Sequence, residues 1–331
     1  MTITNKEMNP KSRVFVAGHR GLVGSALVRA LRASGYGNLL LRTRDLLDLR
    51  DHAAVNAFFA QERPEHVFLA AAVVGGIVAN NNRPAEFILD NLAIQNNVLQ
   101  AAFQYGVKRL LFLGSSCIYP RDCPQPIKEE YLLTGPLEPT NRPYAVAKIA
   151  GIETCWALNR QYGRQFIGAM PTNLYGPGDN YDPEVSHVIP GLIKKMHRAQ
   201  ENGIRSVELW GSGTPRREFL YSDDLAEACV YLMQLAEADF SRLLPRDGPP
   251  IVNIGCGEDL TIRELAKVVG EIVGYAGDFV FDRSKPDGTP RKLLDITRMR
   301  QLGWSPRTGF RIGLKLAYED FLERYVHASI S

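Results

Sequence analysis

A short apolar segment that runs into a glycine-rich turn and then into a helix constrains the fold of this chain more than any other feature. Residues 13–17 are predicted to form a buried parallel strand. The turn that follows places glycine at every third position, at Gly18, Gly21 and Gly24, and helical periodicity begins near Ser25. A strand, a turn and a helix in this order are typical of a dinucleotide-binding unit, because the glycines let the backbone approach a pyrophosphate at the helix N-terminus.

The alternation of strands and helices continues through the first half of the chain. Further strands are predicted at 38–42, 66–72, 109–113 and 166–170, and helices at 53–61, 84–105 and 144–162. This alternation predicts an α/β fold, a Rossmann-type doubly wound parallel sheet with a smaller α/β substrate-binding domain. We place the cofactor-binding domain at 1–174 with about 219–256, and the substrate-binding domain at about 175–218 with 257–331.

The second half of the chain loses that regular alternation after a loop rich in glycine and proline at 176–190. Strands are predicted at 207–210, 250–254 and 279–282, and helices at 189–201, 222–238, 261–273 and about 312–325. Ser222 is expected to cap its helix, and Thr261 with Glu264 has the spacing of a capping box.

Composition and charge exclude several classes of protein. The chain has 331 residues and a net charge of +3, too small to favour nucleic acid or a membrane surface. Its five cysteines form no C-x-x-C pair, so neither a disulfide framework nor a metal site is indicated. No apolar run reaches the roughly 20 residues of a spanning helix. We expect a cytoplasmic protein with no membrane, nucleic-acid or metal partner.

Two arginines follow the second predicted strand, where sites specific for NAD carry an acidic residue. Arg42 and Arg44 occupy this place, and Arg20 lies in the glycine turn. Guanidinium groups bind a 2′-phosphate through paired hydrogen bonds, whereas a carboxylate would repel it. The sequence therefore predicts NADP(H) rather than NAD as the cofactor, and Asp48 is placed to reach the adenine.

Tyr144 and Lys148 lie four residues apart on a helix that begins after Pro143 and ends at Gly163. An ammonium beside a phenol favours the phenolate, so we expect the pKa of Tyr144 to be lowered and the phenol to exchange a proton with a carbonyl or hydroxyl. On its own this spacing also fits a solvated pair on a helix surface.

Polar side chains follow the strand at 109–113, at the edge of the sheet where ligands bind. Strand alternation would direct Ser115 and Cys117 to the same side. Free cysteines are otherwise most often small buried apolar residues, so Cys117 alone carries no assignment.

Ten blocks, in order over nearly the whole chain, resemble the GDP-L-fucose synthase family of the extended short-chain dehydrogenase/reductase superfamily. They are VFVAGHRG at 14–21, GGIVANN at 75–81, GSSCIYP at 114–120, EPTN at 138–141, PYAVAKIAG at 143–151, MPTNLYGP at 170–177, SHVIP at 186–190, WGSGTP at 210–215, REFL at 217–220 and KPDGTPRK at 285–292. The resemblance implies an NADPH-dependent 3,5-epimerase and 4-reductase that converts GDP-4-keto-6-deoxy-D-mannose to GDP-L-fucose.

The resemblance also implies a role for each member of the catalytic set. The C4 ketone acidifies the protons on C3 and C5, so one acid and base pair can invert both centres. Cys117 would be the base and His187 the acid. Tyr144 would donate a proton to the C4 oxygen during hydride transfer, Ser115 would hydrogen-bond that oxygen, and Lys148 would hold the nicotinamide ribose.

The remaining implied contacts are with the cofactor and the sugar nucleotide. The implied cofactor-binding residues are Gly18, Arg20, Gly21, Leu22, Val23, Gly24, Arg42, Arg44, Asp48, Leu113, Gly114, Ser115, Ser116, Tyr144, Lys148, Pro171, Thr172, Asn173, Leu174 and His187. The implied substrate-binding residues are Asn173, Lys195, Trp210, Arg217 and Asp287. Members of the family are commonly homodimers, and the helices at 84–105 and 144–162 could form the interface.

Three alternatives stay open. A GDP-colitose synthase has the same types of catalytic residue but acts on a related sugar nucleotide, one that lacks the C3 hydroxyl. A sugar-nucleotide 4-epimerase or dehydratase would keep bound NAD, which Arg42 and Arg44 disfavour. A catalytically idle NADP-binding regulator on the same fold is disfavoured by the complete set of catalytic residue types.

Overall fold

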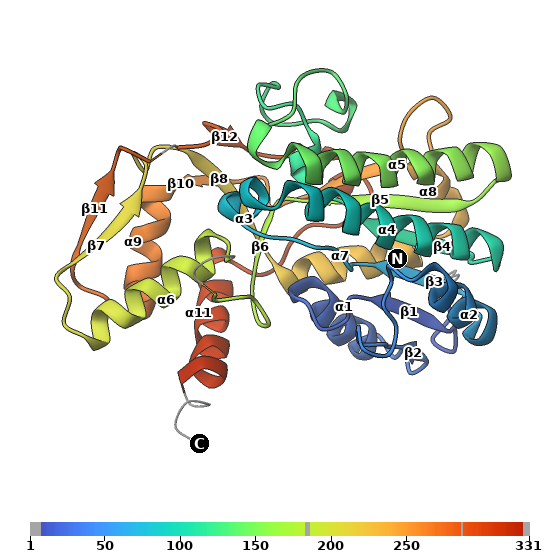
Figure 1. Cartoon of the computed structure of the whole chain (residues 1–331), viewed down its shortest axis with the longest axis horizontal. Coiled ribbons are helices and arrows are strands. Elements are labelled where there is room, and N and C mark those ends of the chain that lie inside the picture. Colours follow the sequence, from blue (N-terminus) through green and yellow to red (C-terminus); the bar gives the residue numbers. More distant parts are fainter. Residues whose placement is uncertain (1–7, 183–185, 286, 327–331) are drawn as a thin grey trace.

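A six-stranded parallel sheet forms the centre of the computed structural model, which describes residues 8–182, 186–285 and 287–326 (Figure 1). Its strands run in the spatial order β2-β1-β3-β4-β5-β9. They are β1 Val14–Ala17, β2 Leu39–Leu40, β3 His66–Leu69, β4 Arg109–Leu113, β5 Gln165–Pro171 and β9 Ile251–Ile254. All five pairings are parallel, and the order reverses between β1 and β3, so the predicted Rossmann-type sheet is confirmed.

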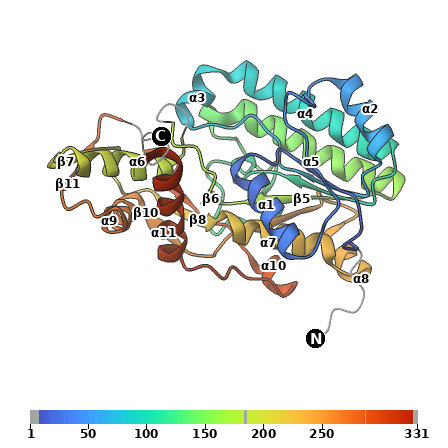
Figure 2. The same ribbon diagram turned by 90° about the horizontal axis from the view of Figure 1, so that it is seen from below.

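Helices cover both faces of this sheet (Figure 2). One face carries α2 His52–Glu62, α4 Pro84–Gln104 and α5 Arg142–Tyr162, and the other carries α1 Leu22–Ala33 and α7 Ser222–Gln234. Side chains alternate between the two layers along each strand. In β4, Leu110 and Phe112 pack into one core and Leu111 and Leu113 into the other. A strand buried on both faces explains why these segments read as continuous apolar runs.

The six-stranded sheet and its helices form the first lobe of the molecule, and a smaller sheet forms the centre of the second lobe. This smaller sheet contains β6 Asn173–Tyr175, β8 Arg216–Tyr221, β10 Asp259–Thr261 and β12 Arg291–Lys292. A separate parallel pair joins β7 Ser206–Trp210 to β11 Asp278–Asp282. The helices α6 Val188–Glu201, α9 Ile262–Val273 and α11 Phe310–Phe321 complete a third core. Strand β8 packs into two cores, because Phe219 and Tyr221 face the third core while Leu220 faces the second.

Most predicted helix ends agree with the structure. Helix α5 ends at Gly163, whose φ of +64° is readily adopted by glycine. Thr261 and Glu264 form the expected reciprocal capping box at α9. The cap predicted at Ser222 is wrong: Tyr221 is the N-cap residue, and the buried Ser222 hydroxyl has no hydrogen-bond partner among the described residues.

Other boundaries differ from the predictions by a few residues. Strand β2 is limited to Leu39–Leu40 and β3 stops at Leu69, and Leu40 and Leu69 are the last residues of each strand that pair with β1. The sequence did not predict the short helix α3 Ile77–Asn82, which precedes α4. The helix expected over 222–238 breaks into α7 and α8 Glu237–Phe240, and α10 Thr297–Gln301 was not predicted. Within the described ranges, no helix has both the length and the apolar character needed to cross a membrane.

Candidate active site

The glycine turn after β1 forms a tight cradle at the N-terminus of α1. Gly18 has a φ of +85°, and a Cβ added there would lie 2.7 Å from the backbone nitrogen of Ala71. A Cβ on Gly24 would lie 1.9 Å from the carbonyl oxygen of Gly18. Gly21 is the N-cap residue and provides no side-chain hydrogen bond, and the first turn carries no acidic residue. The first N–H groups of α1 are therefore placed to bind an anion, which fits the pyrophosphate of a dinucleotide.

The two arginines after β2 have different surroundings. The Arg42 guanidinium pairs with the Glu62 carboxylate at 2.6 Å and lies 5.5 Å from the centre of the Phe58 ring. Arg44 is 71% exposed and reaches Asp48 only at 3.7 Å. The sequence indicated both arginines but not Glu62, which reaches Arg42 from the far end of α2.

The Asp48 carboxylate is held by Arg50. Arg50 donates to it from its backbone nitrogen at 3.0 Å and from its guanidinium at 2.8 Å. These hydrogen bonds lower the pKa of Asp48 to about 2. Arg50 also pairs with Asp90 on α4 at 3.2 Å. The carboxylate oxygens of Asp48 thus accept hydrogen bonds from Arg50 in this structure. The contact of Asp48 with the adenine remains a prediction.

A short 3₁₀ turn, Ser116–Ile118, follows β4 where the sequence suggested continued strand alternation. Ser115 is its N-cap residue, and its hydroxyl accepts a hydrogen bond from the backbone nitrogen of Cys117 at 3.4 Å. The turn leaves Cys117 only 6% exposed, and burial raises the pKa of its thiol. Lys292, the Ser115 hydroxyl and Lys148 partly offset this effect.

Tyr144 and Lys148 lie one turn apart on α5, beside the same cysteine. The Lys148 ammonium donates to the carbonyl of Leu113 at 2.7 Å and lies over the Phe112 ring at 4.7 Å. Burial lowers the pKa of Lys148 to about 8. The expectation of a lowered Tyr144 pKa is wrong for this structure, because burial and then the Cys117 thiolate raise it.

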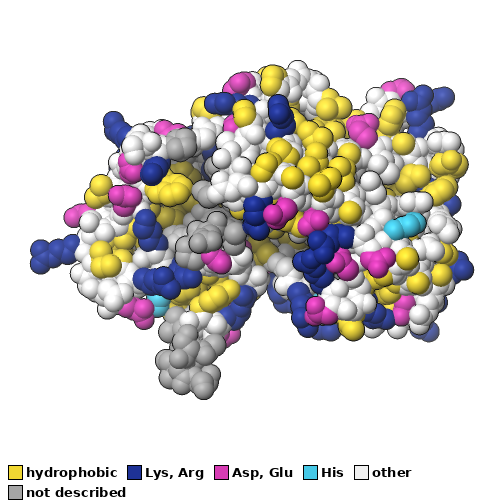
Figure 3. All heavy atoms as spheres, in the orientation of Figure 1, with side chains coloured by type: hydrophobic (Ala, Val, Ile, Leu, Met, Phe, Trp, Pro, Cys, Tyr) yellow, Lys and Arg dark blue, Asp and Glu magenta, His cyan; other side chains and the backbone are white. Residues whose placement is uncertain are grey.

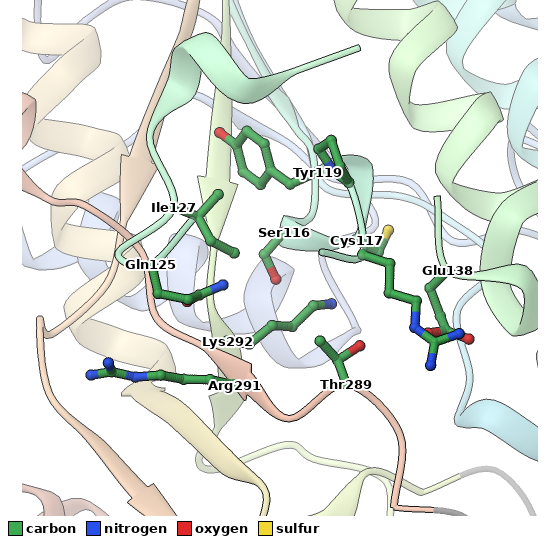
Figure 4. Close-up of a pocket in the computed structure, with 11 residues that line it drawn as sticks. Ser116, Cys117, Tyr119, Gln125, Ile127, Glu138, Thr289, Arg291 and Lys292 are labelled. Carbon is green, nitrogen blue, oxygen red and sulfur yellow. The ribbon is translucent and has the colours of Figure 1, made fainter. Parts of the chain in front are cut away.

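Lys292 is a functional candidate that the sequence did not single out, although it ends the block at 285–292. It lines one small pocket together with Ser116, Cys117 and Glu138 (Figure 4). Burial lowers the pKa of its ammonium, and a Cys117 thiolate opposes that effect. Strand β12 therefore places the Lys292 ammonium in the same pocket as the Cys117 thiol, although the two residues lie far apart in the sequence.

His187 is the N-cap residue of α6 and has an exposed side chain. Surrounding protein atoms still lower the pKa of its imidazole by partial desolvation. It is not among the residues that line the Cys117 pocket. The predicted pairing of His187 with Cys117 stays a prediction.

The segment after β5 lies at the carboxyl edge of the sheet, as expected of residues that pass beneath a nicotinamide. The Thr172 hydroxyl and the Asn173 side-chain amide both donate to the carbonyl of Glu218, at 3.1 and 2.8 Å. Pro171 ends β5 and Leu174 lies within β6. These contacts attach the segment to β8 in the second lobe.

The second lobe brings together two of the predicted substrate residues, Arg217 and Asp287. Burial lowers the pKa of Arg217, and the Asp287 carboxylate opposes that effect. Asp287 accepts hydrogen bonds from the backbone and the hydroxyl of Ser212, at 2.6 and 2.8 Å. Arg217 is thus a partly buried cation near the lobe junction, which suits a diphosphate.

The other two predicted substrate residues of this lobe lie near its surface. Trp210 is 58% exposed, and the Lys285 ammonium lies 5.7 Å from the centre of its ring system. Lys195 is exposed on α6 and donates to the carbonyl of Glu208. An exposed aromatic face and a nearby ammonium are suited to stacking and to anion binding.

Residues 14–255 match the model of the NAD dependent epimerase/dehydratase family. The chain belongs to this family. Within the family it is 55% identical over 315 residues to GDP-L-fucose synthase of Escherichia coli (strain K12), covering 95% of this chain and 97% of the relative. It is 38% identical to GDP-L-colitose synthase of Yersinia pseudotuberculosis, covering 94% and 98% of the two chains.

Two solved structures of the family show how closely the fold is shared. A GDP-6-OMe-4-keto-L-xylo-heptose reductase of Campylobacter jejuni superposes with a TM-score of 0.90 at 39% identity, over 96% of this chain and 99% of that one. A GDP-L-fucose synthetase of Naegleria fowleri bound to NADP gives a TM-score of 0.85 at 32% identity, over 96% and 95%. Both lobes of the chain are therefore covered by its relatives.

Proposed function

We propose that this chain is an NADPH-dependent bifunctional 3,5-epimerase and 4-reductase that converts GDP-4-keto-6-deoxy-D-mannose to GDP-L-fucose. The observation that carries the proposal is the thiol of Cys117 in one site with Tyr144 and Lys148. A tyrosine and lysine pair suits reduction of a carbonyl, while a buried thiol beside two ammonium groups suits removal of a carbon-bound proton. The 55% identity to a GDP-L-fucose synthase supports this substrate.

Reduction at C4 uses residues of the first lobe. When bound, NADPH supplies the hydride. Tyr144 donates a proton to the C4 oxygen, and its raised pKa keeps that proton in place until charge develops there. Ser115 hydrogen-bonds the same oxygen. Lys148 would hydrogen-bond the nicotinamide ribose and would stabilise the phenolate that forms.

Epimerisation at C3 and C5 uses the thiol and the imidazole. Cys117 removes a proton from the carbon beside the ketone, and His187 returns one to the opposite face. Lys292 and Lys148 favour the thiolate and so oppose the effect of burial. His187, at the start of α6, needs to approach Cys117 from the second lobe.

Selection of NADPH rests on the arginines after β2. Arg42, Arg44 and Arg20 would bind the 2′-phosphate, and Asp48 would contact the adenine. The NADP reported in the Naegleria fowleri structure supports this cofactor. In this scheme residues 1–174 with 219–256 hold the cofactor, and residues 175–218 with 257–331 hold the sugar nucleotide through Lys195, Trp210, Arg217 and Asp287.

A GDP-colitose synthase remains the nearest alternative, since its residue types are the same. The identity of 38% to such an enzyme, against 55% to a GDP-L-fucose synthase, favours the fucose pathway substrate. The two activities differ in whether the substrate carries a C3 hydroxyl, so the substrate test below separates them.

A homodimer is proposed from an apolar surface on α4 and α5 (Figure 3). Leu89 is 65% exposed and Val146 is 41% exposed, and a shallow depression beside them is lined by Pro84, Ala85, Ile88, Arg142, Pro143 and Val146. Exposed apolar patches of this kind mark association surfaces. A second copy of this chain, packing its own α4 and α5 against this patch, would form a four-helix interface.

The experiment that tests the function combines the protein with GDP-4-keto-6-deoxy-D-mannose, made in place by a dehydratase, and compares consumption of NADPH and NADH. We expect rapid oxidation of NADPH with GDP-L-fucose as the product. Oxidation that yields an unepimerised sugar would keep the reductase and exclude the Cys117 and His187 roles. Binding of NADPH without oxidation would exclude this substrate, and the 3-deoxy sugar would be tested next.

A further inference from the structure

Glu218 lies at the point where the two lobes meet. It belongs to β8 and is fully buried. One carboxylate oxygen accepts from the backbone nitrogen of Gly257 at 2.7 Å, and the other accepts from that of Leu294 at 2.9 Å. Its own carbonyl accepts from Thr172 and Asn173. One residue thus contacts the segments that follow β5, β9 and β12.

The surroundings of Glu218 require a carboxylate. A Cβ added to Gly255 would lie 2.2 Å from one carboxylate oxygen of Glu218, so a side chain at this position would push the carboxylate from its place. Both oxygens accept from backbone N–H groups, and an amide would turn its own NH₂ group toward one of those donors. Burial raises the pKa of Glu218, and the backbone hydrogen bonds from Leu294 and Gly257 oppose that effect.

The contact with Leu294 fixes the end of β12. Strand β12 pairs in parallel with β8 through Arg291 and Lys292, opposite Arg216 and Arg217. The pairing between β12 and β8 ends at Lys292. Two residues later, the backbone nitrogen of Leu294 donates to the side chain of Glu218 rather than to a backbone carbonyl of β8. Lys292 is therefore held by its pairing with β8, and the chain beyond it is held by the Gln125 side chain at Leu293 and by the Glu218 carboxylate at Leu294.

We infer that Glu218 is a positioning residue, which holds the Lys292 ammonium at the Cys117 thiol and sets the place of its neighbour Arg217 beside the sugar nucleotide. The part that concerns Arg217 rests on the proposed function, whereas the part that concerns Lys292 rests on the geometry of the pocket. Glu218 itself is not a lining residue of that pocket.

The charged and titratable groups around Cys117 come from several elements. Lys292 reaches it from β12, and Tyr144 and Lys148 reach it from α5. Lys292 in turn interacts with Arg217, Glu138 and Cys123. If Lys292 moves away, the thiolate loses one of the two ammonium groups that favour it, Lys292 and Lys148, so the thiol becomes harder to ionise.

The test is the rate at which iodoacetamide labels Cys117 in the NADPH-loaded enzyme between pH 6 and pH 10, followed by mass spectrometry of the peptide that contains it. For Glu218→Gln we expect about fivefold slower labelling near neutral pH and a smaller difference from the wild type toward pH 10, because the thiolate alone reacts. Lys292→Met should give the same change, and the double variant should be no slower than Lys292→Met.

Asp224→Asn is the matched control. Asp224 is also buried, and its two oxygens accept from the backbone and hydroxyl of Thr308, both at 2.9 Å. This variant should lose stability as Glu218→Gln does but keep the labelling profile of the wild type. An equal shift in both variants, or none in Glu218→Gln, would overturn the inference.

A second variant covers the case in which Glu218→Gln does not fold. Gly255→Ala keeps the carboxylate but pushes it from its place, so it should also slow the labelling of Cys117. A wild-type labelling profile would overturn the inference.

The kinetics of both variants, Glu218→Gln and Gly255→Ala, test the part that concerns Arg217. With the GDP-sugar, kcat/KM should fall mainly because KM rises, while NADPH affinity stays within about twofold of the wild type. Labelling requires no sugar substrate, so a slowed profile without turnover would reject the proposed function alone.

Discussion

The ammonium of Lys148 lies 5.8 Å from the centre of the Tyr144 ring and is fixed by its hydrogen bond to the carbonyl of Leu113. Both residues belong to α5, whose start at Arg142 places them at the carboxyl edge of the sheet. Lys148 keeps a pKa of about 8, so it is largely charged at neutral pH. Tyr144 keeps its proton, because burial raises its pKa. The pair is therefore arranged for donation of a proton from the phenol.

Tyr144→Phe should abolish reduction while leaving the fold intact. The variant ring keeps the edge contact of Tyr144 with Phe87, whose ring centre is 6.2 Å away, so only the proton donor is lost. Loss of a general acid should lower kcat by roughly 10²- to 10⁴-fold. The measurement is NADPH oxidation with substrate, beside NADPH binding by fluorescence, which should change less than about twofold. Tyr162→Phe on the exposed end of α5 is the control, and near-normal turnover of Tyr144→Phe would contradict the role.

Cys117→Ser should suppress epimerisation more than hydride transfer. A serine hydroxyl keeps the size of the side chain but does not ionise near neutral pH, so incorporation of solvent deuterium at C3 and C5 should fall roughly 10²-fold or more. The readout is mass spectrometry of the sugar after incubation in deuterated water. Cys123→Ser, a partly exposed cysteine on the same loop, should exchange like the wild type. Wild-type exchange in Cys117→Ser would remove this residue from the mechanism.

Replacing Arg42 and Arg44 by alanine should erode the preference for NADPH over NADH. A hydrogen bond to a charged group contributes about 1.5–3 kcal/mol, so the ratio of the two kcat/KM values should fall by about tenfold or more. Arg42→Ala should have the larger effect alone, because Glu62 already fixes its guanidinium while Arg44 is 71% exposed. Arg32→Ala, in the last turn of α1, serves as the control. An unchanged ratio would assign recognition of the 2′-phosphate to other residues.

His66 should make the protein less stable in acid. It is fully buried at the start of β3, neither ring nitrogen has a hydrogen-bond partner among the described residues, and burial lowers its pKa to about 4. The unfolded imidazole binds a proton near pH 6.5, so between pH 6.5 and 4 the unfolded state binds more protons. The free energy of unfolding should fall as the pH is lowered through that window, by up to about 3 kcal/mol.

Denaturant unfolding of the wild type and of His66→Leu at several pH values isolates this contribution. The difference between the two proteins should grow in favour of the variant as the pH falls from 6.5 to 4 and stay constant above 7. His52→Asn, at an exposed residue, should track the wild type. Parallel curves for wild type and His66→Leu would show that His66 does not titrate with folding.

Val146→Glu should dissociate the proposed dimer. Val146 is 41% exposed on α5 beside the depression lined by α4, and a buried unpaired charge there would cost about 3–5 kcal/mol. The dissociation constant should therefore rise by more than about 100-fold. Sedimentation velocity measures the change. Leu46→Glu, at a residue that is 73% exposed in the loop after β2, should stay dimeric. A monomeric wild type, or a dimeric Val146→Glu, would exclude this interface.

Local sequence determined those features that depend on neighbouring residues. The glycines at 18, 21 and 24 predicted the turn after β1, because close backbone approach excludes a side chain at Gly18 and Gly24. Gly163 predicted the end of α5, and Thr261 with Glu264 predicted the start of α9. Apolar runs predicted the central strands, since a parallel sheet buries both faces of each strand.

The tertiary structure decided what depends on residues far apart in the chain. Lys292 reaches Cys117 across 175 positions, and Glu62 reaches Arg42, in the loop after β2, from the end of α2, so neither pairing has a local pattern. Ser222 has the composition of a cap but lies inside the first turn of α7. The direction of the Tyr144 pKa also follows from the fold, because burial depends on everything that packs around the phenol and outweighs the ammonium one turn away.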